Sequence, residues 1–347
     1  MEAFLKDNDV ENAKKVLVSI MGKDFACVKT RYAPDPLIAS FLLAKNSKGD
    51  IAITFSDSAN CDIELRDLRG DRYIVYGGNN IIHLYDTSFS SLFPLSLDDL
   101  IPILAGIFSS VVLERRPLTD YEKTVLQNAQ NLGVLIEKGL KVPSYKALPA
   151  FISLILSLDP FIPGITGNRE GTIKMIKELD IDETTPIVEI KEEKLNSLIY
   201  RIVSSIINYN PKFSRDDLIT DRVFYLEFDT LELAFATLYF FDIKGSSSLF
   251  QLVSSPSYAE NMILTFREKL SKGFSVGDVV EDKEGYIVKS TLDSPLLTQL
   301  ILLQLQKVKK DKKIFLDING EIFTSRYFLP GENEGLIKVD IRGKDKS

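Results

Sequence analysis

In the first part of the chain, segments with apolar residues at helical spacing alternate with short apolar runs typical of strands. They recur at helical spacing over residues 8–21, where Gly22 suits the end of a helix, and again over residues 37–44. Residues 61–70 are predicted to be a helix or a loop. Short apolar runs predict strands at residues 25–29, 51–55, 73–76 and 81–85. This alternation is typical of an α/β domain with parallel strands and right-handed crossovers.

Several helices are predicted in the middle of the chain. One runs over residues 96–113, and Pro102 should kink it. Thr119 and Glu122 form a capping box for another, which is predicted to end at Gly139. Further helices are predicted at residues 145–158, 169–179 and 192–208.

The pattern changes again after Pro211, where a strand at residues 223–228 precedes an apolar helix at 231–241. Asn319-Gly320 is the strongest hairpin signal in the chain and lies between the predicted strands. Later elements are helices at 258–270 and 295–308 and hairpins at 279–289 and 314–325. We predict an α/β domain with a helical region at residues 1–182, a linker helix at 183–210 and a smaller α/β domain at 211–347.

The composition is that of a globular protein, with 45% hydrophobic and 26% charged residues among 347. Residues 1–20 carry lysines and acidic residues throughout, so we expect no signal peptide, no membrane span and a cytoplasmic location. The net charge of −7 argues mildly against a protein whose main task is to bind phosphate backbones. His83 is the single histidine, which excludes a site built from several imidazoles.

Cys27 and Cys61 are the two cysteines of the chain. They do not have C-x-x-C spacing, which speaks against a zinc site and against a disulfide framework. We interpret them as small buried apolar residues.

Residues 159–167 combine two prolines with two glycines between a buried apolar helix and a new helix. Proline fixes φ and glycine tolerates positive φ, so this segment must be an ordered loop. Asn168 can cap the helix that follows. On local chemistry alone, the loop is either a tight connection between helices or a ligand-binding loop.

The order of these elements resembles the archaeal RecJ-like members of the DHH phosphoesterase superfamily. The resemblance rests on an α/β domain, then Leu104-Ala105-Gly106 on a helix, then the 159–167 loop. It is strongest over residues 25–180, and the C-terminal third matches only the position of the DHH-associated domain. It implies a DHH-type parallel-sheet domain with a helical region, followed by a smaller α/β DHH-associated-like domain. Active relatives bind two Mn²⁺ or Mg²⁺ ions and hydrolyse phosphodiesters.

The metal motifs of this family are degenerate in the chain. The first, His-x-Asp-x-Asp-Gly, is matched by residues 32–37, where Asp35 is out of register. One carboxylate, Asp57, survives near the second motif, and Ser109 or Ser110 replaces the aspartate after Ala-Gly. The degenerate positions are Tyr32, Pro34, Pro36, Tyr76, Gly77, Gly78 and Ser110. The resemblance therefore implies no catalytic residue and no bound metal.

A retained fold with lost catalytic groups is the pattern of the replication proteins related to RecJ. These include the eukaryotic cell-division-cycle-forty-five protein and its archaeal counterparts, which join the GINS complex and the MCM helicase. The resemblance implies a non-catalytic scaffold with GINS and MCM as partners, no cofactor and no small-molecule substrate. Single-stranded DNA is a further candidate ligand. The alternatives are a divergent metal-dependent phosphoesterase or exonuclease and a nucleic-acid-binding module without a helicase partner.

Two segments have a plain structural explanation beside a functional one. Gly77-Gly78 forms either a phosphate-binding turn or an ordinary turn at a strand end, and no lysine or threonine completes a P-loop. The densest basic run is either a DNA contact or a solvated helix end whose cations favour the helix dipole. This run contains Lys307, Lys309, Lys310, Lys312 and Lys313.

Overall fold

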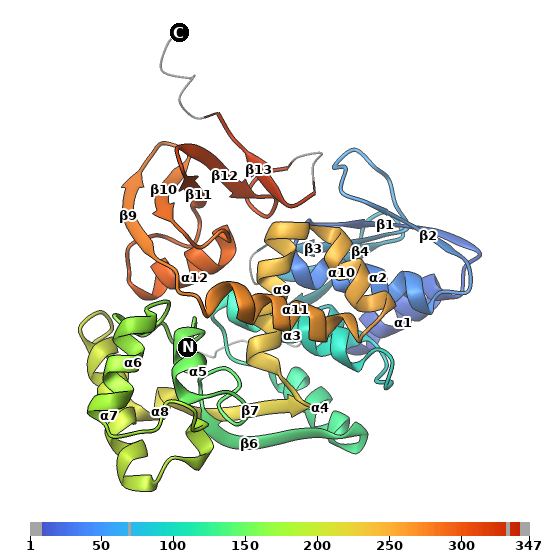
Figure 1. Ribbon diagram of the computed structural model, residues 1–347. Coiled ribbons are helices and arrows are strands. Elements are labelled where there is room, and N and C mark those ends of the chain that lie inside the picture. The colour runs from blue at the N-terminus through green and yellow to red at the C-terminus, as the bar shows by residue number, and fades with distance from the viewer. Residues whose placement is uncertain (1–8, 69–70, 331–333, 341–347) are drawn as a thin grey trace, which may run out of the picture. The chain divides into compact units, whose positions relative to one another are not determined.

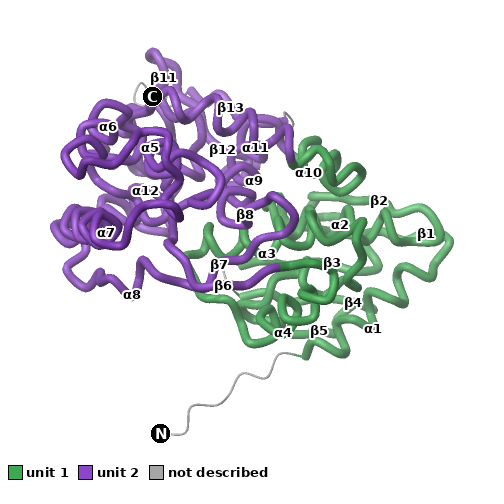
Figure 2. Tube along the Cα trace, turned by 60° about the horizontal axis from the view of Figure 1, so that its bottom comes forward, with its two compact units in different colours: residues 1–134, 246–259 green, residues 135–245, 260–347 purple. Residues whose placement is uncertain are grey.

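The protein is a mixed α/β structure with two compact units. The computed structural model describes residues 9–68, 71–330 and 334–340. The first unit contains residues 1–134 and 246–259, and the second contains residues 135–245 and 260–347 (Figure 2). The boundaries of these units differ from those of the predicted domains at 1–182, 183–210 and 211–347. The predicted domain ranges stay predictions.

The first unit contains a five-stranded sheet of β1 (Phe25–Thr30), β2 (Asp50–Thr54), β3 (Ile63–Asp67), β4 (Arg72–Tyr76) and β5 (Asn80–Tyr85). The strand order is β2-β1-β3-β4-β5. Figure 1 labels β1, β2, β3 and β4 of this sheet. β1 is parallel to β2 and β3, whereas β4 is antiparallel to β3 and β5. Few residues separate β3 from β4 and β4 from β5, and such short connections join only antiparallel strands. The predicted parallel arrangement is confirmed for β1 and β2. It is wrong for β4, which is antiparallel to both of its neighbours.

The prediction of a helix or a loop at residues 61–70 is wrong where β3 lies, and residues 69–70 lie outside the described residues. Ile63 and Leu65 are buried, and they alternate with the more accessible Glu64 and Arg66. This alternation is the period of a half-buried strand, but the run is short and has polar flanks. The partners on either side, β1 and β4, stabilise it as a strand.

The first unit also contains helices. They are α1 (Val10–Met21), α2 (Pro34–Asn46), α3 (Leu100–Glu114), α4 (Asp120–Ala129) and α10 (Ser246–Ser254). α2 contacts β1, β2 and β3 and also packs against α3 and α10. The predicted helices α1 to α3 are confirmed, although Asn8, the predicted start of the first, lies outside the described residues. α10 is not predicted by the sequence pattern.

Two predicted helix features need correction. Pro102 is in the first turn of α3, where its missing N–H has no helical partner to lose, so no kink is required. The capping box of Thr119 and Glu122 is confirmed, but α4 ends at Ala129 rather than at Gly139. Gly133 has a φ of 97°, and β6 (Val134–Leu140) follows it.

The second unit contains a five-stranded sheet of β9 (Val276–Glu281), β10 (Gly285–Ser290), β11 (Lys313–Ile318), β12 (Glu321–Ser325) and β13 (Leu336–Lys338). The strand order is β13-β12-β11-β10-β9. β10 and β11 are parallel, and the other neighbours are antiparallel. Both predicted hairpins are confirmed. Asn319 and Gly320 have φ values of 54° and 86°, as the tight turn between β11 and β12 requires.

The remaining elements of the second unit are a small sheet and a set of helices. The sheet contains β6, β7 (Ile219–Tyr225) and β8 (Phe228–Asp229). The helices are α5 (Ala150–Ile155), α6 (Arg169–Glu178), α7 (Glu192–Ile207), α8 (Arg215–Leu218), α9 (Thr230–Lys244), α11 (Tyr258–Leu270) and α12 (Pro295–Gln304). α5 is shorter than the predicted 145–158, because Pro149 precedes its first residue.

The loop at residues 159–167 is fastened to α12. Gln304 donates a hydrogen bond to the Leu158 carbonyl at 2.7 Å and accepts one from the Phe161 N–H at 2.8 Å. Within the loop, Thr166 donates to the Ser157 carbonyl at 2.7 Å. These bonds satisfy backbone groups that a loop would otherwise expose, so the segment serves as an ordered connection.

A helix that spans a membrane must be long, at about 20 residues, and predominantly apolar. Among the residues that the structure describes, none of the helices meets both requirements.

Candidate functional site

The guanidinium of Arg72 lies at the centre of a buried group of polar side chains in the first unit. Arg72 is the first residue of β4 and is fully buried. Its Nη2 donates to Ser110 Oγ at 2.7 Å, and its Nη1 donates to the Asp86 carbonyl at 3.2 Å. Both Nη atoms also bond to the carboxylate of Glu114. A buried guanidinium needs such partners, because an unpaired charge in the interior is very costly.

Three carboxylates surround this guanidinium, from three different elements. Arg72 Nε lies 3.4 Å from Asp35 Oδ2, and Nη2 lies 3.5 Å from Asp67 Oδ2 and also contacts Glu114. Asp35 is in the first turn of α2, Asp67 ends β3, and Glu114 ends α3. Asp67 pairs with Arg72 because β3 and β4 are antiparallel. The directions of the strands therefore bring these charges together at one edge of the sheet, the edge where β1 and β3 end and β4 begins.

Asp35 has a second set of partners. Its carboxylate accepts hydrogen bonds from the N–H groups of Phe89 and Ser90 at 2.8 and 2.9 Å, and from Ser90 Oγ at 2.7 Å. Burial raises the pKa of Asp35 to about 6, although the charge of Arg72 and the hydrogen bonds from Ser90 and Phe89 oppose that rise. Asp35 thus joins the start of α2 to the segment after β5.

Gly106 leaves room for the contact between Asp35 and Ser90. A Cβ at Gly106 on α3 would lie 2.0 Å from Ser90 Oγ and 3.3 Å from Asp35 Oδ1. The Ala-Gly sequence therefore has a packing role here, because only a residue without a side chain leaves room for Ser90 and Asp35.

A second guanidinium, that of Arg116, extends the group. Arg116 bonds to Glu122 through Nη1 and Nη2, each at 2.8 Å, to Glu114 at 3.1 Å and to Ser110 at 3.0 Å. Burial alone would raise the pKa of Glu122, but Arg116 holds it below its ordinary value. We call the whole set the Arg72 cluster. It contains Asp35, Asp67, Arg72, Ser110, Glu114, Arg116 and Glu122.

The degenerate motif positions are only partly brought together. Ser110 is in the Arg72 cluster, and Pro34 and Pro36 lie in the first turn of α2 beside Asp35. Tyr32 is buried, and its hydroxyl accepts a hydrogen bond from the Ser246 N–H at 2.7 Å, at the start of α10. Its role in the structure is therefore to fix α10.

Tyr76, Gly77 and Gly78 lie elsewhere. They are at the far end of β4 from Arg72, in the turn between β4 and β5. Gly77 and Gly78 have φ values of 54° and 89° and form a turn at the end of β4. A phosphate-binding turn has the same positive φ values, so both interpretations stay predictions. The segment that reaches Asp35 instead follows β5, which ends at the same edge as β1 and β3.

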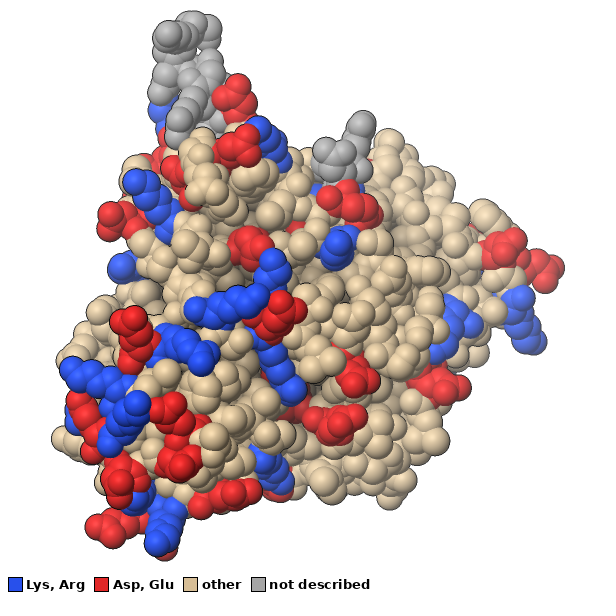
Figure 3. Space-filling model, in the orientation of Figure 1, with Lys and Arg blue, Asp and Glu red and all other residues tan. Residues whose placement is uncertain are grey.

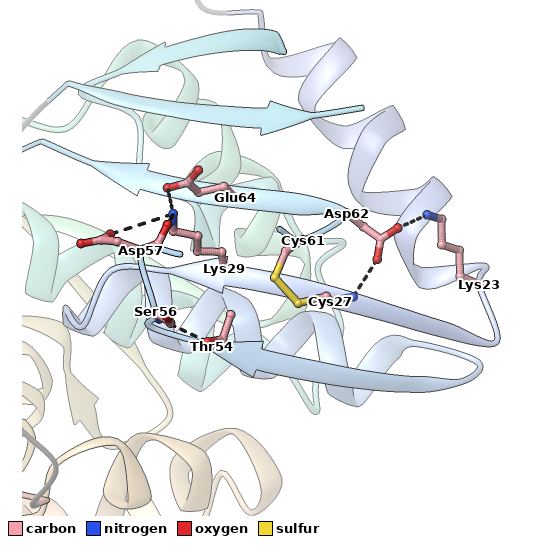
Figure 4. The surroundings of a disulfide bond; sticks show 9 residues. All are labelled: Lys23, Cys27, Lys29, Thr54, Ser56, Asp57, Cys61, Asp62 and Glu64. Carbon is pink, nitrogen blue, oxygen red and sulfur yellow. Dashed lines mark hydrogen bonds and ion pairs between the residues drawn. A yellow bond between two sulfur atoms is a disulfide. The ribbon is translucent and has the colours of Figure 1, made fainter. Parts of the chain in front are cut away.

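The residues of this edge do not fit a pair of divalent ions. No group of three or more His, Cys, Asp or Glu side chains arranged to hold a metal occurs in the described part of the chain. The carboxylates of Asp35, Asp67 and Glu114 face the guanidinium of Arg72, which already supplies the positive charge. The carboxylate of Asp57 is exposed, and its Oδ1 lies 3.9 Å from Lys29 Nζ (Figure 4).

The interpretation of Cys27 and Cys61 as unlinked apolar residues is wrong. A disulfide joins them, with the Cα atoms 4.7 Å apart (Figure 4). Cys27 is on β1, Cys61 precedes β3, and both are half-buried. Parallel pairing of Val28 with Ile63 brings the two together, and their separation along the chain does not reveal this. Asp62 accepts a hydrogen bond from the Cys27 N–H at 2.8 Å and contacts Lys23.

The basic run lies between α12 and β11. Lys307, Lys309 and Lys310 are exposed, whereas Lys312 pairs with Glu281 and lies 5.4 Å from the centre of the Tyr286 ring. Lys313 begins β11. Lysines and arginines alternate with acidic side chains over the face shown in Figure 3. DNA contact through this run stays a prediction.

Sequence reasoning missed most members of the Arg72 cluster. Arg72 occupies a position that alternates with Ile74 on the buried face of β4, and a charged residue at such a position is a signal for a buried ion pair. Glu114 is the last residue of the apolar helix α3, Arg116 follows this helix, and Glu122 is in the first turn of α4. None of the three has a comparable signal for a buried ion pair in the sequence. Their role depends on the packing of α3 and α4.

Comparisons with known proteins agree with this architecture. A family model described as Archaeal Cdc45 matches residues 1–342. The crystal structure of CDC45 from Entamoeba histolytica superposes with a TM-score of 0.52 at 10% identity, over 92% of this chain and 88% of that chain. This match confirms the predicted fold class, a mixed α/β structure whose sheets contain parallel strands. No curated protein matches the sequence. Because the family model spans nearly its whole length, the chain belongs to the archaeal Cdc45 family.

Proposed function

We propose that this protein is a cytoplasmic, non-catalytic DNA replication factor, a scaffold subunit of the archaeal replicative helicase with GINS and MCM as partners. Membership of the archaeal Cdc45 family supports a replication-associated factor. The observation that carries the non-catalytic part is the guanidinium of Arg72, buried among Asp35, Asp67 and Glu114.

This arrangement is unsuited to metal-assisted hydrolysis. A metal-dependent phosphoesterase needs carboxylates that face the ions and an open position where water and substrate bind. Here the side chains of Arg72, Asp35 and Glu114 are 1%, 3% and 6% exposed. The carboxylates are neutralised by a side chain and covered by the packing of α2 and α3. A substrate would not reach them without opening of the unit.

An activity assay tests the non-catalytic part. We expect no nuclease or phosphodiesterase turnover with Mn²⁺ or Mg²⁺, on single-stranded DNA, RNA or a small phosphodiester. An active RecJ-like phosphoesterase serves as the positive control. Metal-dependent turnover that is lost in both Asp35→Asn and Asp57→Asn would instead favour the divergent phosphoesterase.

Copurification tests the scaffold part. The tagged chain should retain GINS and MCM from a native extract at low salt, and an active RecJ-like phosphoesterase on the same resin controls for capture by the fold alone. Recovery of neither partner, together with tight binding to single-stranded DNA, would favour a nucleic-acid-binding module without a helicase partner.

Contact with single-stranded DNA is proposed for the exposed part of the basic run. Lys307, Lys309 and Lys310 project from the segment between α12 and β11, and exposed lysines bind phosphates by releasing counterions. Because the net charge of the chain is −7, we expect any such contact to be confined to this basic run.

A further inference from the structure

We propose that the groove between α1 and α4 is a docking site for a short amphipathic helix of a partner protein. The docked helix has apolar residues on one face and an acidic residue near one end of that face. The groove lies in the first unit, and the residues that line it belong to a different set from the Arg72 cluster. The inference therefore does not depend on the proposed function.

Three elements form the groove. α1 and α4 line two of its sides, and the segment of residues 91–95 lines the third. Lys14 Nζ on α1 lies 5.0 Å from the centre of the Tyr121 ring on α4, and the Tyr121 hydroxyl donates to the Ser91 carbonyl at 3.3 Å. These contacts join the three elements directly to one another, so the groove is preformed. Its volume of about 400 Å³ is within the range of ligand pockets, about 300–1,000 Å³.

The residues that line the groove recur at helical spacing on both helices. α1 contributes positions 14, 17, 18 and 21, and α4 contributes positions 121, 125 and 128. Each set extends over two helical turns, or about 10 Å at a rise of 1.5 Å per residue. A docked helix of the same length matches this groove, because amphipathic helices bind apolar grooves through residues at i, i+3 or i+4 and i+7.

The groove exposes apolar surface on α1 outside the buried face of that helix. The buried face consists of positions 10, 13, 17 and 20. Val18 lies outside this set and is 60% exposed, and Met21 and Leu95, which also line the groove, are half-buried. Covering these side chains with a second apolar surface removes them from water, which favours binding.

The charge of Lys14 selects the kind of helix. Among the described residues that line the groove, Lys14 is the one that carries a charge. Its ammonium pairs with Glu11 at 3.1 Å, and the Glu11 side chain is 77% exposed. Such an exposed pair contributes little free energy, and an ammonium has three donors, so a further carboxylate can bind it. An acidic residue of the docked helix complements this end of the groove, whereas a basic residue would be repelled.

Peptide selection tests the docking site. A phage-displayed library of helix-forming peptides of about 15 residues is selected on the full-length native protein and depleted on Val18→Arg. Peptides that remain should carry apolar residues at i, i+3 or i+4 and i+7, with Asp or Glu on the same face. If no peptide distinguishes the native protein from Val18→Arg, the proposal is wrong.

Binding of one selected synthetic peptide is then measured by fluorescence anisotropy. Val18→Arg should weaken it about tenfold or more, because a charge then lies against the apolar face of the peptide. Val280→Arg on β9 is the matched control, since Val280 is also 60% exposed but does not line the groove. Both variants should keep the native circular dichroism. Equal weakening by the two variants would overturn the proposal.

An exchange of charges tests the role of Lys14. Lys14→Glu should weaken binding of the acidic peptide about tenfold. A peptide with lysine in place of its acidic residue should bind Lys14→Glu more tightly than it binds the native protein. Indifference of both peptides to this substitution would contradict the proposed acidic helix.

Sedimentation velocity distinguishes a partner helix from a second copy of this chain. The native protein should sediment as a monomer at micromolar concentration, with and without the peptide. A native dimer that Val18→Arg dissociates would assign the groove to a second copy and overturn the proposal.

Discussion

Arg72 Nε lies 3.4 Å from Asp35 Oδ2, and both side chains are buried where β1 and β3 end. Asp35 lies within the segment that matches the first family motif, but out of register with the aspartates of that motif. Its carboxylate faces the guanidinium of Arg72 instead of a metal. Its other bonds, from Phe89 and Ser90, tie α2 to the segment after β5. A carboxylate with these partners serves packing at the sheet edge.

Gly106→Ala should destabilise the first unit. The new Cβ would lie 2.0 Å from Ser90 Oγ, and overpacking of this kind costs about 1–3 kcal/mol. Urea unfolding measures the loss. Gly22→Ala is the matched control, because its Cβ meets nothing closer than 3.6 Å and its φ is −84°. Equal stability of the two variants would show that α3 can shift away from Ser90.

The stability of the second unit should fall as pH rises through the titration range of Asp242. Asp242 is buried and accepts from Ser294 Oγ at 2.6 Å and from the Leu296 N–H at 2.9 Å, at the start of α12. Burial raises its pKa from 3.8 to about 7, while the hydrogen bond from Ser294 opposes the rise. The folded state therefore keeps a proton that the unfolded chain has lost, and stability falls between these two values.

The variant Asp242→Asn removes this titration. The difference in unfolding free energy between native protein and variant should change by about 3 kcal/mol from pH ~4 to pH ~7, given 1.36 kcal/mol per pKa unit. Urea denaturation over this pH range gives the difference directly. Parallel pH profiles for the two proteins would show that Asp242 is ionised throughout.

Reduction of the disulfide should destabilise the protein. The bond between Cys27 and Cys61 closes a loop with a sequence separation of 34, which corresponds to about 4 kcal/mol of unfolded-state entropy. Unfolding in urea with and without dithiothreitol measures this contribution. The double variant Cys27→Ser and Cys61→Ser should start at the lower stability and should not respond to dithiothreitol. A native protein that titrates two thiols before reduction would contradict the prediction.

Charge reversal in the basic run should weaken binding to single-stranded DNA. The triple variant Lys307→Glu, Lys309→Glu and Lys310→Glu is expected to lower affinity and to reduce the slope of log K against log salt by about 2, at about 0.7 per phosphate contact. Fluorescence anisotropy at several salt concentrations measures both. Lys272→Glu and Lys283→Glu, at exposed positions outside this run, are the controls. An unchanged slope would assign any DNA contact to another surface.

The sequence determined those features that depend on neighbouring residues. The turn at Asn319-Gly320 and the capping box of Thr119 and Glu122 are local, because each satisfies its own backbone groups within a few residues. The helices α1, α2 and α3 follow from apolar spacing in the same way. The resemblance to the DHH phosphoesterases rested on the order of such elements, and this order is confirmed.

Tertiary structure alone decided which distant residues meet. β3 is a strand because β1 and β4 pair with it, and that pairing also brings Cys61 to Cys27 and Asp67 to Arg72. Because β4 is antiparallel to β3, Gly77 and Gly78 at its end lie away from Asp35. In the sequence these glycines follow a strand, as the Asp-His-His motif of the family does. The periodicity of apolar residues indicates which face of an element is buried. Which charged residues meet at one edge of the sheet depends on the order and direction of the strands.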